Sequence, residues 1–383
     1  RKLKAAFVCD RFDPTGGGLE RWIAQMRPRL ERRGHEVHVV ACEVADGLRD
    51  DRVHVAGSGA GRLARAAALG RVIEALAPDV VHDTGSGLHF DVLHPQSGSK
   101  LANHRRDLAS LPPLARLRRR ANPALYRWRR EVRELERRQC APGPGLVIAV
   151  SEMVARDLRD SCGVAPERLR LVPNGIDTEH FAPPRCAALR AAARARMGVD
   201  EATTVVLFAA HNARLKGLPE LLRATARLRA TGARLRLVAI GGDATAEYGR
   251  LAARLGLGEV VRFEGTVADP LPYYAAADVF ALPTWYDACS LVVLEALACG
   301  LPVVTTRWNG AADLLSHGRD GFVVGEPDDV AALAESIARA SAPGIRDRVS
   351  IAARQTALRN GLDRNAEAVE SVWFEILRGR PRA

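Results

Sequence analysis

The segment 282–305, Leu-Pro-Thr-Trp-Tyr-Asp-Ala-Cys-Ser-Leu-Val-Val-Leu-Glu-Ala-Leu-Ala-Cys-Gly-Leu-Pro-Val-Val-Thr, decides the fold of this chain. A strand-like apolar run ends at Leu282, a polar loop follows, and a helix is predicted to begin near Ser290. A second strand-like run begins at Pro302. Strands separated by helices in this way are typical of a parallel sheet with helices on its faces.

One acidic residue of this segment stands at an unusual place for a charge. Glu295 lies in the predicted helix among Leu291, Leu294 and Leu297. Burying a carboxylate costs free energy unless it is paired or hydrogen-bonded. Two vicinal ribose hydroxyls would satisfy both oxygens of Glu295, and a buried Glu–Arg pair is the structural alternative. Asp287 stands eight residues earlier, just before the helix.

The alternation of short apolar strands and amphipathic helices extends over the rest of the chain. It pauses at the turn signal Pro173-Asn-Gly175 and at Ala182-Pro-Pro-Arg185, which resembles a linker, and then starts again. We therefore predict an α/β chain with two doubly wound, Rossmann-like domains that face a cleft. The predicted domains are residues 1–182 and 183–362, and a helix at 363–383 could return to the first domain.

Composition limits the class of protein. The 383 residues suit two domains, and the net charge is 56 − 45 = +11. Seven cysteines, irregularly spaced and without a Cys-x-x-Cys pair, predict free thiols in a reducing compartment. The N-terminal apolar run is too short for a secretory signal, and no apolar stretch is long enough to span a membrane. We find no DNA-binding motif and expect no nucleic-acid partner.

Two loops carry residues suited to anions. Near Ala210 a predicted strand ends, and Arg214-Leu-Lys216-Gly217 precedes a helix. Arginine can grip two oxygens of a diphosphate and lysine acts as a point charge. A solvated pair is the alternative, but cations at a helix N-terminus oppose its dipole, so an anion should compensate them. In the first domain, Gly16-Gly-Gly18 is either a flexible turn or a phosphate contact before a helix.

These motifs resemble the retaining glycosyltransferases of family 4, which have the GT-B fold. The resemblance covers nearly the whole chain, and within the family it is strongest to lipopolysaccharide-core glucosyltransferases that use UDP-glucose. Its carriers are Gly16-Gly-Gly18 with Glu20-Arg21, Leu171-Val-Pro-Asn-Gly-Ile-Asp177, Arg214-Leu-Lys216-Gly217, and the acidic-x7-Glu motif that ends at Glu295.

The resemblance implies roles in binding the nucleotide-sugar donor. Arg214 and Lys216 match the basic pair that neutralises the diphosphate, and Glu295 matches the acid that holds the ribose hydroxyls. Asp287 stands where the family usually has Glu, in contact with hydroxyls of the donor sugar. The remaining donor contacts implied are the backbone amides of Cys289, Ser290 and Leu291, with Gly17 and Gly18 closing over the phosphates from the other domain.

The resemblance also implies a histidine near the reacting anomeric carbon. His94, at the end of a strand-like run, could hydrogen-bond the sugar or handle the acceptor proton. His82 and Asp83, which end the preceding strand, are alternatives. We assign no enzyme nucleophile, because retaining transfer on this fold can proceed by front-face attack.

The chemistry of the leaving group fits these residues. Negative charge grows on the nucleoside diphosphate as the glycosidic bond breaks, and preformed positive groups stabilise it. The sequence contains no Asp-x-Asp motif, which some transferases use to recruit a divalent cation. We therefore expect transfer of a hexose without a metal or other cofactor.

An arginine tract at 103–138 carries most of the excess charge. Between His104 and Arg138 there are 12 Arg and 4 acids, a net charge of 12 − 4 = +8, with Leu, Tyr and Trp residues interleaved. This pattern suits an anionic membrane surface or a phosphorylated glycolipid, and a solvated or acid-paired helix is the alternative. We expect a cytoplasmic monomer, peripherally associated with the inner face of the cytoplasmic membrane, that glycosylates a cell-envelope glycan or lipid such as lipopolysaccharide core.

Three other functions fit parts of the pattern. A nucleotide-sugar 2-epimerase would need the nucleotide-binding residues but no acceptor. A non-catalytic membrane-surface binding protein would need neither Lys216 nor Glu295. An NAD-dependent dehydrogenase would need a G-x-G-x-x-G motif with an acid downstream, which the sequence lacks.

Overall fold

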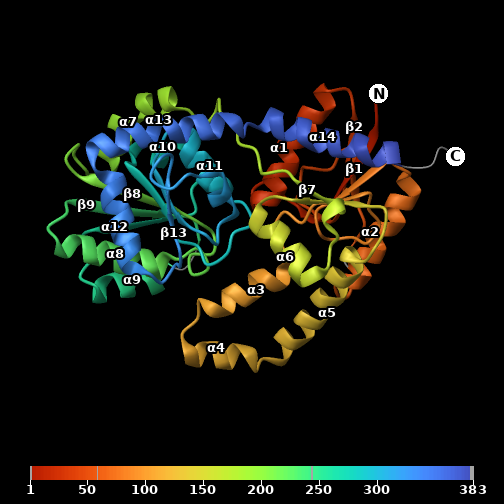
Figure 1. The fold of residues 1–383 in the computed structure, drawn as a ribbon, viewed down its shortest axis with the longest axis horizontal. Coiled ribbons are helices and arrows are strands. Elements are labelled where there is room, and N and C mark those ends of the chain that lie inside the picture. The colour runs from red at the N-terminus through yellow and green to blue at the C-terminus, as the bar shows by residue number, and fades with distance from the viewer. Residues whose placement is uncertain (1, 58, 243–244, 380–383) are drawn as a thin grey trace. The chain divides into compact units, whose positions relative to one another are not determined.

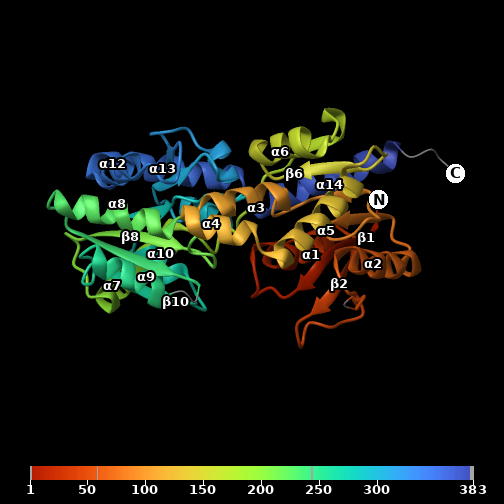
Figure 2. The same ribbon diagram turned by 90° about the horizontal axis from the view of Figure 1, so that it is seen from below.

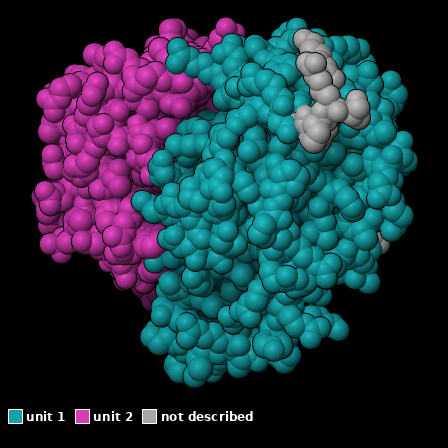
Figure 3. Space-filling model, turned by 45° about the vertical axis from the view of Figure 1, so that its right-hand side comes forward, with its two compact units in different colours: residues 1–174, 362–383 teal, residues 175–361 magenta. Residues whose placement is uncertain are grey.

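Two parallel β-sheets, each with helices packed against it, organise the chain (Figure 1). The computed structural model describes residues 2–57, 59–242 and 245–379. The chain divides into two units, which Figure 3 draws in different colours. Unit 1 comprises residues 1–174 and 362–383, and unit 2 comprises residues 175–361. The predicted α/β class with two doubly wound sheets is confirmed.

Unit 1 contains, among its described residues, a seven-stranded parallel sheet of order β3-β2-β1-β4-β5-β6-β7. Its strands are β1 (Lys4–Phe12), β2 (Glu36–Val44), β3 (Val53–Val55), β4 (Val80–Asp83), β5 (Val92–Leu93), β6 (Leu146–Ala149) and β7 (Leu169–Leu171). Its helices are α1 (Gly18–Arg32), α2 (Arg62–Leu76), α3 (Lys100–Ala109), α4 (Pro113–Arg120), α5 (Pro123–Cys140), α6 (Glu152–Cys162), the 3-10 turn η1 (Pro166–Arg168) and α14 (Leu362–Gly379).

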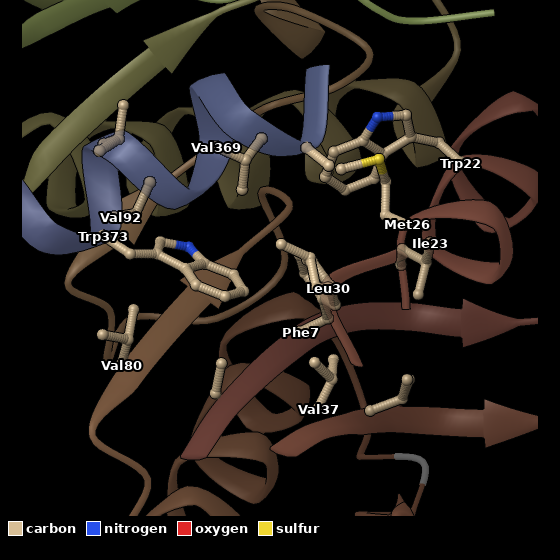
Figure 4. Close-up of a cluster of buried hydrophobic side chains, with 14 of the residues drawn as sticks. Phe7, Trp22, Ile23, Met26, Leu30, Val37, Val80, Val92, Val369 and Trp373 are labelled. Carbon is tan, nitrogen blue, oxygen red and sulfur yellow. The ribbon is translucent and has the colours of Figure 1, made fainter. Parts of the chain in front are cut away.

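Side chains of β1 alternate between the two faces of this sheet, as the pleat of a strand requires. Phe7 belongs to the larger core cluster, where it packs with Trp22 of α1 and Trp373 of α14 (Figure 4). Val8, its neighbour in the chain, belongs to a second cluster with Leu69 of α2. Because both faces are covered, the middle of β1, residues 5–9, is an apolar run without polar alternation.

The C-terminal helix α14 returns to unit 1, as the sequence predicted. Its buried residues recur every three or four positions and so form one apolar face; they are Leu362, Asn365, Ala366, Val369, Val372, Trp373 and Ile376. Within this face, the indole N–H of Trp22 donates to Asn365 Oδ1 at 2.9 Å. Residues 380–383 of the predicted tail helix lie outside the described residues.

Unit 2 contains, within the part of it that the structure describes, a six-stranded parallel sheet of order β10-β9-β8-β11-β12-β13. Its strands are β8 (Thr204–Ala209), β9 (Leu235–Ile240), β10 (Val261–Gly265), β11 (Val279–Leu282), β12 (Val303–Thr306) and β13 (Phe322–Val324). Its helices are α7 (Pro183–Met197), α8 (Leu218–Ala230), α9 (Thr245–Arg254), α10 (Leu271–Ala276), α11 (Leu291–Ala298), the 3-10 turn η2 (Gly310–Leu314), α12 (Val330–Ser341) and α13 (Pro343–Arg359).

In each of the two sheets the order of the strands reverses at one point. In unit 1 the order reverses between β1 and β4, and in unit 2 between β8 and β11. In open α/β sheets, ligands bind outside the carboxyl ends of the strands at such a switch point. The loops that follow these four strands are therefore the candidate ligand-binding segments.

The division of the chain differs from the predicted boundaries of 182 and 362. It falls after Asn174 and after Gly361. The segment 182–185, interpreted as a linker, begins helix α7, whose first turn holds Pro183 and Pro184. Proline is tolerated there because the first N–H groups of a helix have no intrahelical partner. The short strand β3 was not predicted.

Helices α3, α4 and α5 form a feature of their own, which we call the basic lobe and define as residues 100–140. Helix α4 protrudes from unit 1 between the other two helices (Figures 1 and 2). None of its residues is buried. Across the described residues, no helix has the length and apolar character needed to cross a membrane.

Candidate functional site

The carboxyl ends of β8 and β11 bring together two residues that the sequence singled out. The loop after β8 carries Lys216 and the loop after β11 carries Asp287. Lys216 Nζ donates to Asp287 Oδ2 at 2.5 Å and to the Tyr286 carbonyl at 3.1 Å. The two charged side chains are 21% and 17% exposed. The sequence led us to expect that an anion compensates the cations at the start of α8. In this structure Asp287 is such an anion.

A glycine permits the close approach of these two loops. Gly217 has φ +82, and a Cβ added to it would lie 2.0 Å from the Pro283 carbonyl oxygen. A side chain at this position would therefore both strain the backbone and force the loops apart. The backbone around it is fixed, since the Trp285 N–H donates to the Leu215 carbonyl at 2.8 Å.

Arg214 belongs to the same loop as Lys216. Its carbonyl accepts the N–H of Gly217 at 3.0 Å, so the residue is part of the turn that leads into α8. It is half-buried, as is Lys216. The structure thus keeps both members of the predicted basic pair in one tight turn at the switch point of unit 2.

Glu295 lies on α11 and is 1% exposed, as its apolar neighbours predicted. Its Oε2 accepts a hydrogen bond from the Tyr274 hydroxyl at 2.7 Å. Tyr274, on α10, is also 1% exposed. A buried carboxylate needs such donors. This donor is a hydroxyl, the same kind of donor as the ribose hydroxyls expected for this residue.

Asn309 is a site residue that sequence reasoning missed. It is fully buried, and its Oδ1 accepts the N–H groups of Ser290 at 3.3 Å and Ala311 at 3.1 Å. Its Nδ2 donates to Thr305 Oγ1 at 3.0 Å. Asp287 N–H donates to the Trp308 carbonyl and Gly310 N–H to the Asp287 carbonyl, at 2.9 and 2.8 Å. Asn309 therefore fixes the loop that carries Asp287.

This arrangement bears on the three backbone amides expected to face the donor. Ser290 is the N-cap of α11, and its N–H is directed to Asn309. Leu291 is the first residue of α11, where N–H groups have no intrahelical acceptor. Cys289 precedes them in the same loop and is buried. The Ser290 amide therefore has a protein acceptor in this structure.

In unit 1 the predicted glycines lie where β1 leads into α1. Gly17 is the N-cap of α1, in extended backbone, and Gly18 is its first residue. A Cβ on Gly17 would lie 2.8 Å from a carboxylate oxygen of Glu20. Burial raises the pKa of Glu20. The N-terminus of α1 is thus already faced by a carboxyl group of its own first turn.

His82 and Asp83 are the last two residues of β4, and His94 directly follows β5. All three are fully buried. The His82 and His94 rings are hydrogen-bonded, with 3.0 Å between His82 Nε2 and His94 Nδ1. Burial lowers the pKa of His94 to about 3 and that of His82 well below its usual value. Both rings are therefore neutral near pH 7.

Asp83 is held by the backbone rather than by a cation. Its two oxygens accept the N–H groups of Gly85, Ser86 and Gly87 at 2.6, 2.7 and 2.6 Å. Burial raises the pKa of Asp83 to about 6, against the lowering effect of these three donors. Asp83 shapes the turn after β4.

All seven cysteines are free thiols, as predicted. Within the described ranges, no group of three or more His, Cys, Asp or Glu side chains could hold a metal ion.

Two family models match the chain. The model described as "Glycosyltransferase Family 4" matches residues 16–180, and the one described as "Glycosyl transferases group 1" matches residues 202–342. Together they fall on the two units. The family 4 model begins in the loop that follows β1, and the group 1 model begins just before β8.

Curated relatives agree with these models. D-inositol 3-phosphate glycosyltransferase of Kineococcus radiotolerans is 30% identical over 89% of this chain and 84% of the relative. The enzyme of that name from Streptomyces bingchenggensis is 34% identical over 62% of this chain and 54% of the relative. With the first four relatives, the alignment spans about half of the relative's length.

Solved structures share the fold. WaaG, a glycosyltransferase involved in lipopolysaccharide biosynthesis, superposes with a TM-score of 0.76 over 98% of this chain and all of the other, at 22% identity. HepE of Anabaena, solved with UDP-glucose, superposes with a TM-score of 0.68 over 97% and 99%, at 20% identity. At these identities the likeness establishes the fold.

The buried hydrogen bonds of Asn309 generate a prediction. Asn309→Ala leaves the Ser290 and Ala311 amides without their acceptor, at a cost of about 1–3 kcal/mol for each buried group. We expect faster hydrogen exchange across 287–311 and a lower free energy of unfolding of unit 2. The matched control is Asn122→Ala, which removes an exposed N-cap of α5 in unit 1. Equal exchange of 287–311 in both variants would contradict the positioning role.

Proposed function

The chain belongs to glycosyltransferase family 4, and on that premise we propose that it transfers a hexose from a nucleotide sugar to a hydroxyl of an acceptor. The observation that carries the proposal is the Lys216–Asp287 pair at the switch point of unit 2. A cation held at this edge is suited to a diphosphate, and a carboxylate beside it is suited to sugar hydroxyls. One charged pair thus serves both halves of a nucleotide sugar.

The donor-binding roles follow from chemistry and position. Lys216 and Arg214 neutralise the diphosphate, whose charge grows as the glycosidic bond breaks. Glu295 accepts hydrogen bonds from the ribose hydroxyls, with Tyr274 holding one of its oxygens beforehand. A uridine nucleotide is favoured by the resemblance, and the structural neighbour HepE was solved with UDP-glucose. We propose UDP-glucose or a similar UDP-hexose as the donor.

The reaction proposed is retaining and independent of metal. The sequence has no Asp-x-Asp motif, and Lys216 and Arg214 supply positive charge where other transferases use a cation. Retention follows from the resemblance to family 4. A front-face attack by the acceptor hydroxyl needs no enzyme nucleophile, and none is assigned.

We propose an acceptor that carries phosphate. The curated relatives are named for D-inositol 3-phosphate, and the structural neighbour WaaG for lipopolysaccharide biosynthesis. The basic lobe of unit 1 supplies the charge for such an acceptor. Its exposed arginines include Arg118, Arg119, Arg120, Arg127 and Arg130. A phosphorylated cell-envelope glycan or lipid fits this surface.

The same lobe supports binding to an anionic membrane. Leu114, Leu117 and Tyr126 are 73%, 66% and 70% exposed, next to these arginines. Arg119 is paired with Asp107, and Arg137 and Arg138 are paired with Glu134. The tract keeps a net positive charge, because its arginines outnumber its acids. Exposed apolar side chains beside cations are typical of surfaces that insert at a lipid interface.

A donor screen tests the proposed function. In excess EDTA, a UDP-hexose at 100 times its Kd is expected to stabilise the folded protein by about 2.7 kcal/mol. The unfolding temperature should therefore rise. Lys216→Ala and Glu295→Ala should lose this shift, while Lys2→Ala, a mostly exposed lysine elsewhere, should keep it. Turnover that needs an acceptor distinguishes transfer from epimerisation. Loss of turnover in EDTA that Mn²⁺ or Mg²⁺ restores would refute metal independence.

Sedimentation with vesicles tests the membrane surface. The double change Leu114→Ser and Leu117→Ser removes exposed apolar groups worth about 1.5–3 kcal/mol each when buried. We expect the partition coefficient onto anionic vesicles at low salt to fall at least about tenfold. Ile351→Ser is the matched control, since Ile351 is 66% exposed on α13 of unit 2. Unchanged binding of the double variant, or no binding of the unaltered protein, would overturn the proposal.

A further inference from the structure

A continuous chain of side-chain hydrogen bonds crosses the core of unit 1. It begins on α14, where Trp373 extends into the core (Figure 4), and the Trp373 indole N–H donates to His82 Nδ1 at 2.9 Å. His82 Nε2 and His94 Nδ1 are 3.0 Å apart. His94 Nε2 lies 3.2 Å from Gln96 Nε2. The chain thus links the C-terminal helix to the loop after β5.

Water has no access to the inner part of this chain. Trp373, His82 and His94 are 0% exposed, and Gln96 is 8% exposed. Burial lowers the pKa of both histidines, so each ring is neutral and carries one N–H. The position of that hydrogen is therefore set by the neighbouring side chains alone.

The proton positions follow from the first member of the chain. An indole nitrogen can only donate, so His82 Nδ1 must accept and the proton of His82 must lie on Nε2. That N–H points at His94 Nδ1, which must also accept. The proton of His94 is therefore on Nε2. A single donor on α14 determines the tautomers of both rings.

The last member of the chain is constrained in the same way. His94 Nε2–H needs an acceptor, and the side chain of Gln96 can offer one only through its amide oxygen. The structure places Gln96 Nε2 next to His94 Nε2, and exchanging the nitrogen and oxygen of this amide brings Oε1 there as the acceptor that the His94 N–H requires.

We propose that α14 fixes the proton of His94 through Trp373 and His82, so that His94 is a hydrogen-bond donor that orients Gln96 and is not the base of the transfer reaction. The part concerning the reaction rests on the proposed function. In a neutral ring whose Nδ1 accepts from His82 and whose Nε2 carries a proton, no nitrogen is left to take the proton of an acceptor. His94 then acts as a positioning residue, because its N–H orients the side-chain amide of Gln96.

The structure offers a matched control for the first link. Trp22, on α1, packs against the same histidines, with ring centroids 5.1 Å from His94 and 5.9 Å from His82. Its indole N–H also bonds to α14, at Asn365 Oδ1. Trp22→Phe and Trp373→Phe therefore each remove one buried indole hydrogen bond between α14 and the rest of unit 1. Only Trp373→Phe breaks the chain.

The tautomers can be measured without substrate. In the full chain labelled with ¹⁵N-histidine, NMR at pH 7 reports which ring nitrogen carries the proton, and His82→Gln and His94→Gln assign the signals. We expect Nε2–H on both rings in the unaltered protein and in Trp22→Phe, and a second tautomer on both rings in Trp373→Phe. A proton on Nδ1 of His94, a charged His94, or spectra unaffected by Trp373→Phe would overturn the proposal. If Trp373→Phe fails to fold, the spectrum of the unaltered protein still decides.

Kinetics test the consequence for the reaction separately. Glutamine can place an amide N–H where Nε2–H stands in histidine, so His94→Gln should lose less kcat/KM than the roughly 10²–10⁴-fold that a general base supplies. His94→Leu, which offers no donor, should lose more. Equal losses in the two variants would refute the donor role. An inactive protein with the predicted tautomers would instead refute the proposed function and leave the proton assignment intact.

Discussion

The contact between Lys216 and Asp287 is the interaction on which the rest of unit 2 depends for its chemistry. A lysine at the start of α8 faces the positive end of a helix dipole, and a carboxylate from the next loop offsets this cost. The two loops meet only because β8 and β11 are neighbours at the switch point of the sheet. Gly217 permits the approach, and Asn309 fixes the loop of Asp287 from behind.

Unit 1 uses polar groups in a different way. Its His82, His94 and Asp83 lie at the same edge of the sheet but are fully buried, and each is satisfied by protein donors or acceptors. Buried groups of this kind hold side chains in place and set the directions of hydrogen bonds. The positive charge of unit 1 lies instead on its surface, in the basic lobe. Positive charge of the chain is thus found in two separate places, at the proposed diphosphate site around Lys216 and on the exposed basic lobe.

Sequence patterns predicted those features of the fold that are determined by residues close together in the chain. Two doubly wound sheets, the return of α14, the burial of Glu295 and the loop that carries Lys216 all follow from periodicity and turn residues near one another in the chain. The partners of these residues could not be predicted in the same way. Trp373 and His82 are 291 positions apart, and Ser290 and Asn309 belong to different loops. Strand β3 is three residues long and too short for periodicity to reveal. A Pro-Pro pair served as the start of α7 rather than as a linker, because both roles tolerate proline.

We propose that Lys216 is a preformed cation for a nucleoside diphosphate and that Asp287 holds it until the diphosphate arrives. Titration calorimetry with UDP in excess EDTA tests this most directly. We predict that Lys216→Ala weakens UDP binding about ten- to a hundredfold, the range for a hydrogen bond to a charged group, and that Asp287→Asn leaves UDP binding equal or stronger. Weakening of UDP binding by Asp287→Asn to the same extent as by Lys216→Ala would contradict the claim.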